Sequence, residues 1–153
     1  MRDPVAGGQK RILGLDVGLR RIGLALSDPL GITAQGIETL VRGNLKRDLA
    51  RLSRLAEEND VGLFVVGLPL HMSGEDSRQG GWVKEFAVRL EQRSRVPVRL
   101  WDERLTTVEA ARVLRQSGIS IEKRAKAVDR LSAVLILQSY LDSLPGANDC
   151  PNG

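Results

Sequence analysis

Residues 11–27, RILGLDVGLRRIGLALS, place two apolar runs on either side of a basic turn. Residues 11–17 and 22–27 each have the length and composition of a strand, and the connection Gly18–Arg21 is short enough to join antiparallel neighbours. Because side chains alternate between the two faces of a strand, Asp16 shares one face with small or apolar residues. The stretch therefore predicts a β-hairpin with a carboxylate on the surface of its sheet.

The later segments alternate between the patterns of strands and helices. Apolar residues at a helical spacing follow Asn44, a possible N-cap, whereas residues 63–67 are continuously apolar, as in a parallel strand covered on both faces. In chain order we expect a strand at 32–40, a helix at 44–59, a strand at 63–67, a loop at 68–81, a helix at 82–92, a strand at 96–101, and helices at 106–116 and about 125–143. Because parallel strands need helical crossovers, this order predicts an α/β fold, a mixed sheet with helices on its faces.

The composition is that of one globular domain. The chain has 153 residues, of which 42% are hydrophobic and 27% charged, an ordinary balance for a soluble protein. We expect the domain at residues 11–143, with flexible tails at 1–10 and 144–153. No apolar run approaches the roughly 20 residues that span a bilayer, and no secretory signal is visible, so a cytoplasmic protein is expected. The single cysteine, Cys150, excludes an intramolecular disulfide and a zinc site built from several cysteines.

Basic residues outnumber acidic ones, with 23 Lys and Arg against 19 Asp and Glu, and the net charge is +4. Those in the helix at 44–59 fit a solvated helix face. The candidates for contact with the phosphates of a nucleic acid are Arg20 and Arg21 in the hairpin turn, Arg104, and the group Lys123, Arg124 and Lys126 in the connection just before Asp129. For Arg20, Arg21 and Arg104 a solvated surface is an equally good interpretation, whereas the group at 123–126 is near enough to Asp129 in sequence to hold a phosphate backbone against a metal there. Only 3% of the residues are aromatic, so binding by base stacking is not expected.

Three carboxylates stand in or beside apolar segments: Asp16 in the first strand, Glu103 after the strand at 96–101, and Asp129 at the start of the last helix. Taking an ionised side chain out of water costs several kcal/mol, roughly, unless it is paired or binds a cation. Simpler interpretations exist, with Glu103 as a salt-bridge partner of Arg104 and Asp129 as a favourable charge in the first turn of a helix. Together, the three acids predict a site for Mg²⁺ or Mn²⁺, and two such ions would support phosphodiester hydrolysis.

Four motifs, GLDVGLRRIGLALSD, VVGLP, DERLTT and AVDRLSAVLILQSYL, occur in this order between residues 11 and 142. In sequence and spacing they resemble the bacterial YqgF family of pre-16S rRNA nucleases, also described as Holliday-junction-resolvase-like, in the ribonuclease H-like superfamily. The resemblance implies a ribonuclease H-like fold with a five-stranded mixed sheet flanked by helices, and metal-dependent cleavage of nucleic acid. It also implies that Asp16 bridges two ions, while Glu103 and Asp129 each complete one coordination shell.

The resemblance places processing of the 5′ end of the 16S ribosomal RNA precursor first, and resolution of Holliday junctions second. The partner would be structured RNA or branched DNA. A resolvase should be a symmetric dimer whereas RNA trimming needs one site, so a monomer and a homodimer both stay open. Two other classes of protein are alternatives to a nuclease. One is a non-catalytic nucleic-acid-binding factor, and the other is a sugar-kinase-like or actin-like ATPase, which the pattern G-x-D-x-G suggests. The length of the chain, 153 residues, argues against an ATPase of this kind, because those proteins close two such domains around ATP.

Overall fold

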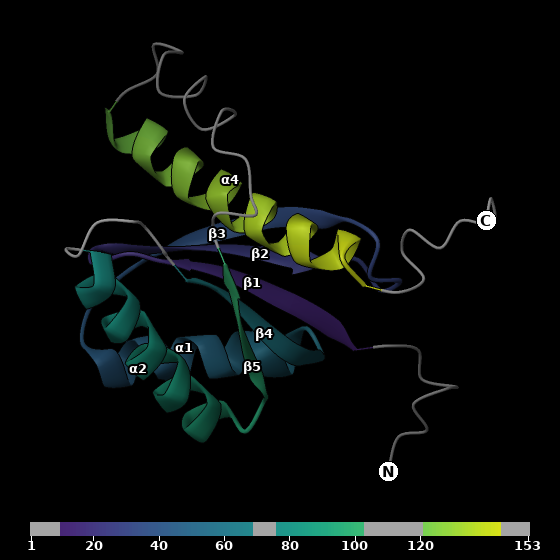
Figure 1. Cartoon of the computed structure of the whole chain (residues 1–153), viewed down its shortest axis with the longest axis horizontal. Coiled ribbons are helices and arrows are strands. Elements are labelled where there is room, and N and C mark those ends of the chain that lie inside the picture. Colours follow the sequence, from purple (N-terminus) through teal and green to yellow (C-terminus); the bar gives the residue numbers. More distant parts are fainter. Residues whose placement is uncertain (1–9, 69–75, 103–120, 145–153) are drawn as a thin grey trace.

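The computed structural model describes residues 10–68, 76–102 and 121–144, and a five-stranded sheet forms its centre. The strands are β1 (Arg11–Val17), β2 (Arg21–Ser27), β3 (Ala34–Val41), β4 (Val61–Leu68) and β5 (Val98–Asp102), in the spatial order β3-β2-β1-β4-β5 (Figure 1). β2 is antiparallel to both β1 and β3, whereas β4 runs parallel to both β1 and β5. The predicted hairpin and the predicted five-stranded mixed sheet are therefore confirmed.

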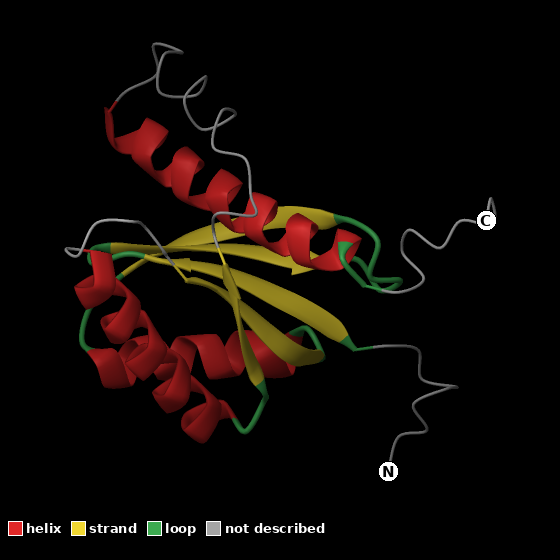
Figure 2. Ribbon diagram, viewed as in Figure 1, coloured by secondary structure: helices red, strands yellow, loops and turns green. Residues whose placement is uncertain are grey.

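Helices in the described residues cover both faces of this sheet. α1 (Leu45–Glu58) and α2 (Asp76–Ser94) pack together on one face, and α4 (Ile121–Asp142) crosses the other (Figures 1 and 2). Each face has its own apolar core. Leu13 and Leu15 of β1 belong to the core under α1 and α2, and Ile12 packs against the core under α4, as the alternation of side chains predicts. We call the second side the α4 face.

The start and the buried side of α1 follow from its sequence. The Asn44 side chain accepts a hydrogen bond of 2.8 Å from the Arg47 backbone N–H, which is the contact expected of an N-cap. Leu49, Leu52 and Leu55 recur at helical spacing and are buried in the core. The predicted helix at 44–59 is confirmed.

Helix α2 begins earlier than its sequence suggests. The prediction of a loop at 68–81 is wrong for residues 76–81, which form the first turns of α2. Paired glycines at 80 and 81 argue against a helix, since each costs about 1 kcal/mol relative to alanine. The helix forms because its later residues Val83, Phe86 and Leu90 are buried in the core, and tertiary packing contributes more than intrinsic preference.

Helix α4 also begins earlier, at Ile121 rather than at about residue 125. Lys123 and Arg124 therefore lie inside the helix together with Lys126, and the prediction of a connection just before Asp129 is wrong. Glu, Lys, Arg and Ala dominate residues 121–128, and their intrinsic helix preference extends α4 beyond its apolar stripe. Asp129 consequently lies eight residues after the first residue of α4, not in its first turn.

Several predicted features lie outside the described residues. These are the helix at 106–116, the candidate site residues Glu103 and Arg104, and the tails at 1–10 and 144–153 apart from Lys10 and Leu144. Among the helices of the described segments, none has the length and apolar character needed to cross a membrane.

Candidate active site

Asp16 lies near the edge of the sheet at which the parallel strands end. It is the last residue but one of β1, and the residue before it, Leu15, pairs with Val66 of β4. Leu68 at the end of β4 pairs in turn with Asp102 at the end of β5. The carboxyl ends of parallel strands are where open α/β sheets carry their ligand sites. Asp16 is thus half-buried at a position suited to chemistry.

Asp129 reaches the same region from α4. Across the hairpin, Asp16 pairs with Gly23, and the backbone of Asp129 lies so close to Gly23 that a Cβ atom there would collide with the Asp129 carbonyl group. Paired residues of antiparallel strands point to the same face of the sheet. Asp16 and Asp129 therefore occupy neighbouring positions on the α4 face.

Glycines under α4 make this close approach possible. A Cβ atom on Gly14 of β1 would lie 2.7 Å from the Cβ of Leu137, and Gly23 of β2 accommodates Asp129 in the same way. Neither glycine is among the site residues predicted from the sequence. The available signal was an isolated glycine inside a strand pattern, which often marks the close approach of another backbone. These glycines set the distance between Asp129 and the strands.

Arg21 of the hairpin binds Asp129 directly. Its Nε donates a hydrogen bond of 2.6 Å to Asp129 Oδ2, and the two side chains are 33% and 23% exposed. A charge-assisted hydrogen bond of this length is a strong one. Asp129 lies about two turns inside α4, beyond the reach of the helix dipole at its start, so the helix-dipole interpretation is wrong. The ion pair ties the hairpin to α4 and places a guanidinium beside the candidate acids.

The other basic candidates occupy two places. Arg20 is exposed in the hairpin turn, next to Arg21. Lys126 is half-buried three residues before Asp129, and its backbone carbonyl accepts a hydrogen bond of 2.8 Å from the Thr39 hydroxyl, which fastens α4 to β3. Lys123 and Arg124 precede it in the same helix. The structure thus brings Arg20 and Arg21 to the hairpin beside Asp16, and the other three to the first half of α4.

Strand β5 leads toward the third candidate acid. Arg99 lies over the Tyr140 ring of α4 at 5.9 Å, and the Trp101 ring meets Tyr140 edge-on with 5.3 Å between centroids. Glu103, two positions after Trp101, lies outside the described residues. In the segments that the structure describes, no three His, Cys, Asp or Glu side chains form a group that could hold a metal ion. The described part of the candidate site consists of two acids and the arginine bound to one of them.

Comparison with known proteins identifies close relatives over most of the chain. A family model described as "RuvX: Holliday junction resolvase" matches residues 10–143. A protein of Koribacter versatilis (strain Ellin345) named "Putative pre-16S rRNA nuclease" is 58% identical over 142 residues, which are 93% of this chain and 92% of the relative. A protein of the same name from Clostridium novyi (strain NT) is 48% identical and covers 88% of this chain and 99% of its own length.

Solved structures share the fold at low sequence identity. RuvC of T. thermophilus in complex with a Holliday junction substrate has a TM-score of 0.58 and 14% identity, and covers 91% of this chain and 98% of its own. The Holliday junction resolvase of fowlpox virus has a TM-score of 0.53 and 17% identity, and covers 88% and 99%. These similarities confirm the ribonuclease H-like fold.

Proposed function

Because the chain belongs to the RuvX family, we propose that it is a metal-dependent nuclease that hydrolyses phosphodiester bonds in nucleic acid. The observation that carries this proposal is the shared position of Asp16 and Asp129 on the α4 face, at the carboxyl end of β1. Two carboxylates at neighbouring positions repel each other unless a cation lies near them. Arg21 supplies one positive charge there, and it binds Asp129.

The donor set fits a hard divalent cation. Carboxylate oxygens are the protein ligands that Mg²⁺ and Mn²⁺ prefer, and Asp16, Asp129 and Glu103 would provide them. Glu103 is included because it directly follows β5 in the chain, and β5 ends beside β4 at the edge where the parallel strands end. Two divalent ions held there would supply an activated water and stabilise the leaving oxygen.

The basic residues are proposed to hold the nucleic acid. Arg20, exposed beside Asp16, can bind a phosphate with two parallel hydrogen bonds, and Arg21 keeps a fixed positive charge at the acids. Lys126 and its neighbours Lys123 and Arg124 in α4, together with Arg104, would extend this contact along the phosphate backbone. In this arrangement the basic groups draw the scissile phosphate toward Asp16 and Asp129.

The first candidate substrate is the 5′ end of the 16S ribosomal RNA precursor. Relatives named for that activity are 48% and 58% identical to this chain, whereas the solved resolvases share only 14% and 17%. A protein with this substrate acts in the cytoplasm. Holliday junctions are the second candidate, favoured by the description of the matching family. A resolvase would act as a homodimer with two sites, while a monomer suffices for RNA trimming.

The test uses the full chain with two labelled substrates, an RNA that carries the 16S precursor end and a four-way DNA junction. Each is incubated with Mg²⁺, Mn²⁺ or EDTA. We expect cleavage of the RNA that EDTA abolishes and that Asp16→Asn reduces by about 100-fold or more. Glu57→Gln is the matched control, because it changes an exposed acid on α1 in the same chemical way and should keep full activity.

The alternatives give different results in the same experiment. Paired, symmetric cuts in the junction without cleavage of the RNA would assign the protein to junction resolution. Tight binding of either substrate without cleavage in any metal would contradict the nuclease proposal and favour a non-catalytic binding factor. Cleavage that Asp16→Asn leaves intact would contradict the proposed site.

A further inference from the structure

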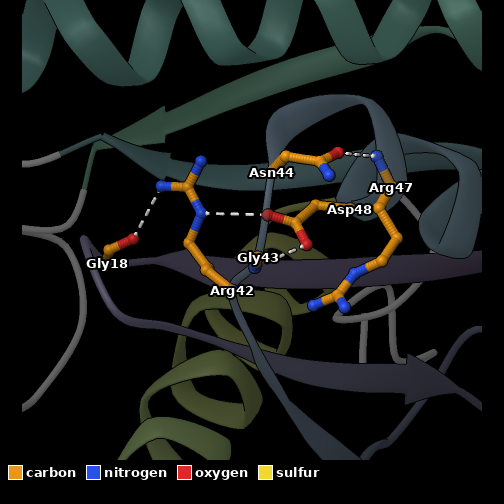
Figure 3. A network of polar contacts seen from close by, with 6 residues as sticks. All are labelled: Gly18, Arg42, Gly43, Asn44, Arg47 and Asp48. Carbon is orange, nitrogen blue, oxygen red and sulfur yellow. Dashed lines mark hydrogen bonds and ion pairs between the residues drawn. The ribbon is translucent and has the colours of Figure 1, made fainter.

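On the face of the sheet opposite α4, Arg42 joins the hairpin turn to helix α1. Its Nη1 donates a hydrogen bond of 3.0 Å to the carbonyl oxygen of Gly18, and its Nε lies 3.4 Å from Oδ2 of Asp48 (Figure 3). The Arg42 side chain is 14% exposed and that of Asp48 only 1%. A buried carboxylate needs a charged or hydrogen-bonding partner, so loss of the Arg42 side chain would leave the buried charge of Asp48 without its cation.

The start of α1 holds Asp48 in place. Its other oxygen, Oδ1, accepts a hydrogen bond of 3.1 Å from the Gly43 backbone N–H (Figure 3). The Asp48 backbone N–H donates to the carbonyl of Asn44, the residue that caps the helix. With one oxygen fixed by the backbone, Asp48 presents the other to Arg42. The carboxylate thereby fixes the orientation of the guanidinium.

Two aromatic side chains of helix α2 lie close to the guanidinium group of Arg42. The Arg42 Cζ lies 4.9 Å from the centre of the Trp82 ring and 5.4 Å from that of Phe86. A planar, delocalised cation can stack on aromatic rings and donate hydrogen bonds from its edge at the same time. Lysine carries the same charge on a single ammonium group and lacks the planar fork of donors with which Arg42 bonds Gly18 and Asp48 from two different nitrogens. The geometry at Arg42 therefore requires arginine rather than a positive charge alone.

The carbonyl that Arg42 binds belongs to the turn between Asp16 and Arg21. The Gly18 N–H donates to the carbonyl of Arg21 at 2.9 Å and closes that turn, and the Arg42 backbone N–H donates to the carbonyl of Arg20 at 2.9 Å. One side of the turn leads back to Asp16 and the other to Arg21, which binds Asp129 on the α4 face. Arg42 thus reaches the candidate acids through the backbone of the turn.

We propose that Arg42, oriented by Asp48, is a positioning residue that fixes the hairpin turn and thereby the placement of Asp16 and Arg21 relative to Asp129. Its effect on cleavage rests on the proposed nuclease function, whereas its effect on the turn does not. Outer partners of this kind typically change activity by about 10- to 100-fold when they are lost.

The first measurement follows the turn itself by hydrogen exchange of the Gly18 amide in ¹⁵N-labelled protein. Arg42→Lys keeps the charge but removes the fork of donors that bonds Gly18 and Asp48 from separate nitrogens, and we expect the Gly18 amide to exchange about tenfold faster or more. Arg51→Lys is the matched control. Arg51 also pairs with an acid, Glu38, at 3.2 Å between α1 and β3, and Glu38 lies opposite Leu24, inside β2 and not in the turn. Gly18 exchange should not change in that variant.

The second measurement compares cleavage by the same variants. In Arg42→Lys, kcat should fall by about tenfold or more, while KM and binding in EDTA change by less than about threefold. Ala56→Gly weakens the interior of α1 away from the turn and controls for lost stability, so its kcat should stay normal below its melting temperature. If Arg42→Lys does not fold, Asp48→Asn, which retains an oxygen for the Gly43 N–H, provides the same comparison.

The two proposals fail in different ways. Unchanged Gly18 exchange in a folded Arg42→Lys or Asp48→Asn protein overturns the positioning role, whatever the activity is. Faster exchange in a protein whose wild type cleaves no substrate supports the positioning of the turn and contradicts the nuclease function. Faster exchange with an unchanged kcat would show that the turn does not position the acids, and the inference would be wrong.

Discussion

At the scale of single residues, two glycines that face α4 differ in the room they leave for a side chain. A Cβ on Gly23 would collide with the backbone of Asp129, whereas one on Gly36 would lie 3.4 Å from the Cβ of Arg130, an ordinary contact. Gly23→Ala must push α4 away from the hairpin. We expect it to lower the free energy of unfolding by at least about 2 kcal/mol and to reduce cleavage by displacing Asp129.

Urea denaturation of both alanine variants tests this prediction. Gly36→Ala should stay within about 1 kcal/mol of the wild type, because the added methyl fits and alanine restricts the unfolded chain more than glycine does. Neither glycine has a positive φ angle, so backbone strain does not separate the two substitutions. Equal effects at the two positions would contradict the close packing of α4 on Gly23.

Asp28 controls the turn between β2 and β3 and makes its stability depend on pH. Backbone N–H groups, first that of Thr33 and then those of Ile32 and Leu30, donate to the carboxylate at 2.9, 2.7 and 3.3 Å and lower the pKa of Asp28, against a smaller opposing effect of burial. Because the folded pKa is lowered, this stabilisation is present above the ordinary aspartate pKa of about 4 and is lost as pH falls through the lower folded value.

Asp28→Ala should therefore lower the free energy of unfolding by about 1 kcal/mol at pH 7. The difference from the wild type should shrink as the pH falls below about 4, where both states of the wild type become protonated. Asp28→Asn keeps an accepting oxygen but no titratable charge, so residue 28 should contribute equally to the stability of that variant over the whole range, and its difference from the wild type should also change as the pH falls. Thermal melts between pH 2.5 and 7 measure all three proteins, and a constant Asp28→Ala difference would contradict the expected titration.

At the scale of elements, the stability of α1 depends on the N-cap contact made by Asn44. Asn44→Ala removes the side-chain acceptor of the Arg47 N–H and should lower the free energy of unfolding by about 1 kcal/mol. Asn44→Ser keeps a capping oxygen and should recover most of that loss. Chemical denaturation measures both. An equal loss in the two variants would mean that packing of the Asn44 side chain, and not the cap, stabilises the helix.

Elements whose signal is local could be predicted from the sequence, and those set by packing could not. The β1–β2 hairpin and α1 carry their own patterns, an alternating pair of runs and a capped apolar stripe. The start of α2 was missed because glycines 80 and 81 lower the local preference for helix, while the residues that hold it are buried later in the chain. Burial by distant elements is not visible in a local pattern.

The same distinction applies to the candidate site. Strand alternation predicts which face of the sheet Asp16 points to. Only the structure shows that Asp129 packs against Gly23, the residue that pairs with Asp16 across the hairpin. The Arg21–Asp129 ion pair joins residues 108 positions apart and depends on where α4 crosses the hairpin. Likewise, no sequence pattern connects Arg42 to the carbonyl of Gly18, because that contact arises only when β3 returns beside the turn.

At the scale of the whole molecule, a net charge of +4 favours a polyanionic partner, and the position of each charge decides its contribution. A residue that contacts a phosphate releases a counterion on binding, so the logarithm of affinity falls with the logarithm of salt concentration by about 0.9 for each such contact on duplex DNA and about 0.7 on single strands. Charges away from the interface change this slope little. Salt dependence therefore separates the basic residues at the site from those that only raise the net charge.

Arg20 and Arg54 provide that comparison, because both are exposed arginines and only Arg20 lies near the candidate acids. Arg20 lies in the turn beside Asp16, while Arg54 lies on α1, which covers the other face of the sheet. Binding of the labelled RNA in EDTA, measured between 50 and 300 mM salt, should show a slope smaller by about one unit in Arg20→Ala and unchanged in Arg54→Ala. Equal slopes for both variants would remove Arg20 from the proposed interface. A smaller slope in Arg54→Ala alone would move the interface to the α1 side, away from Asp16 and Asp129.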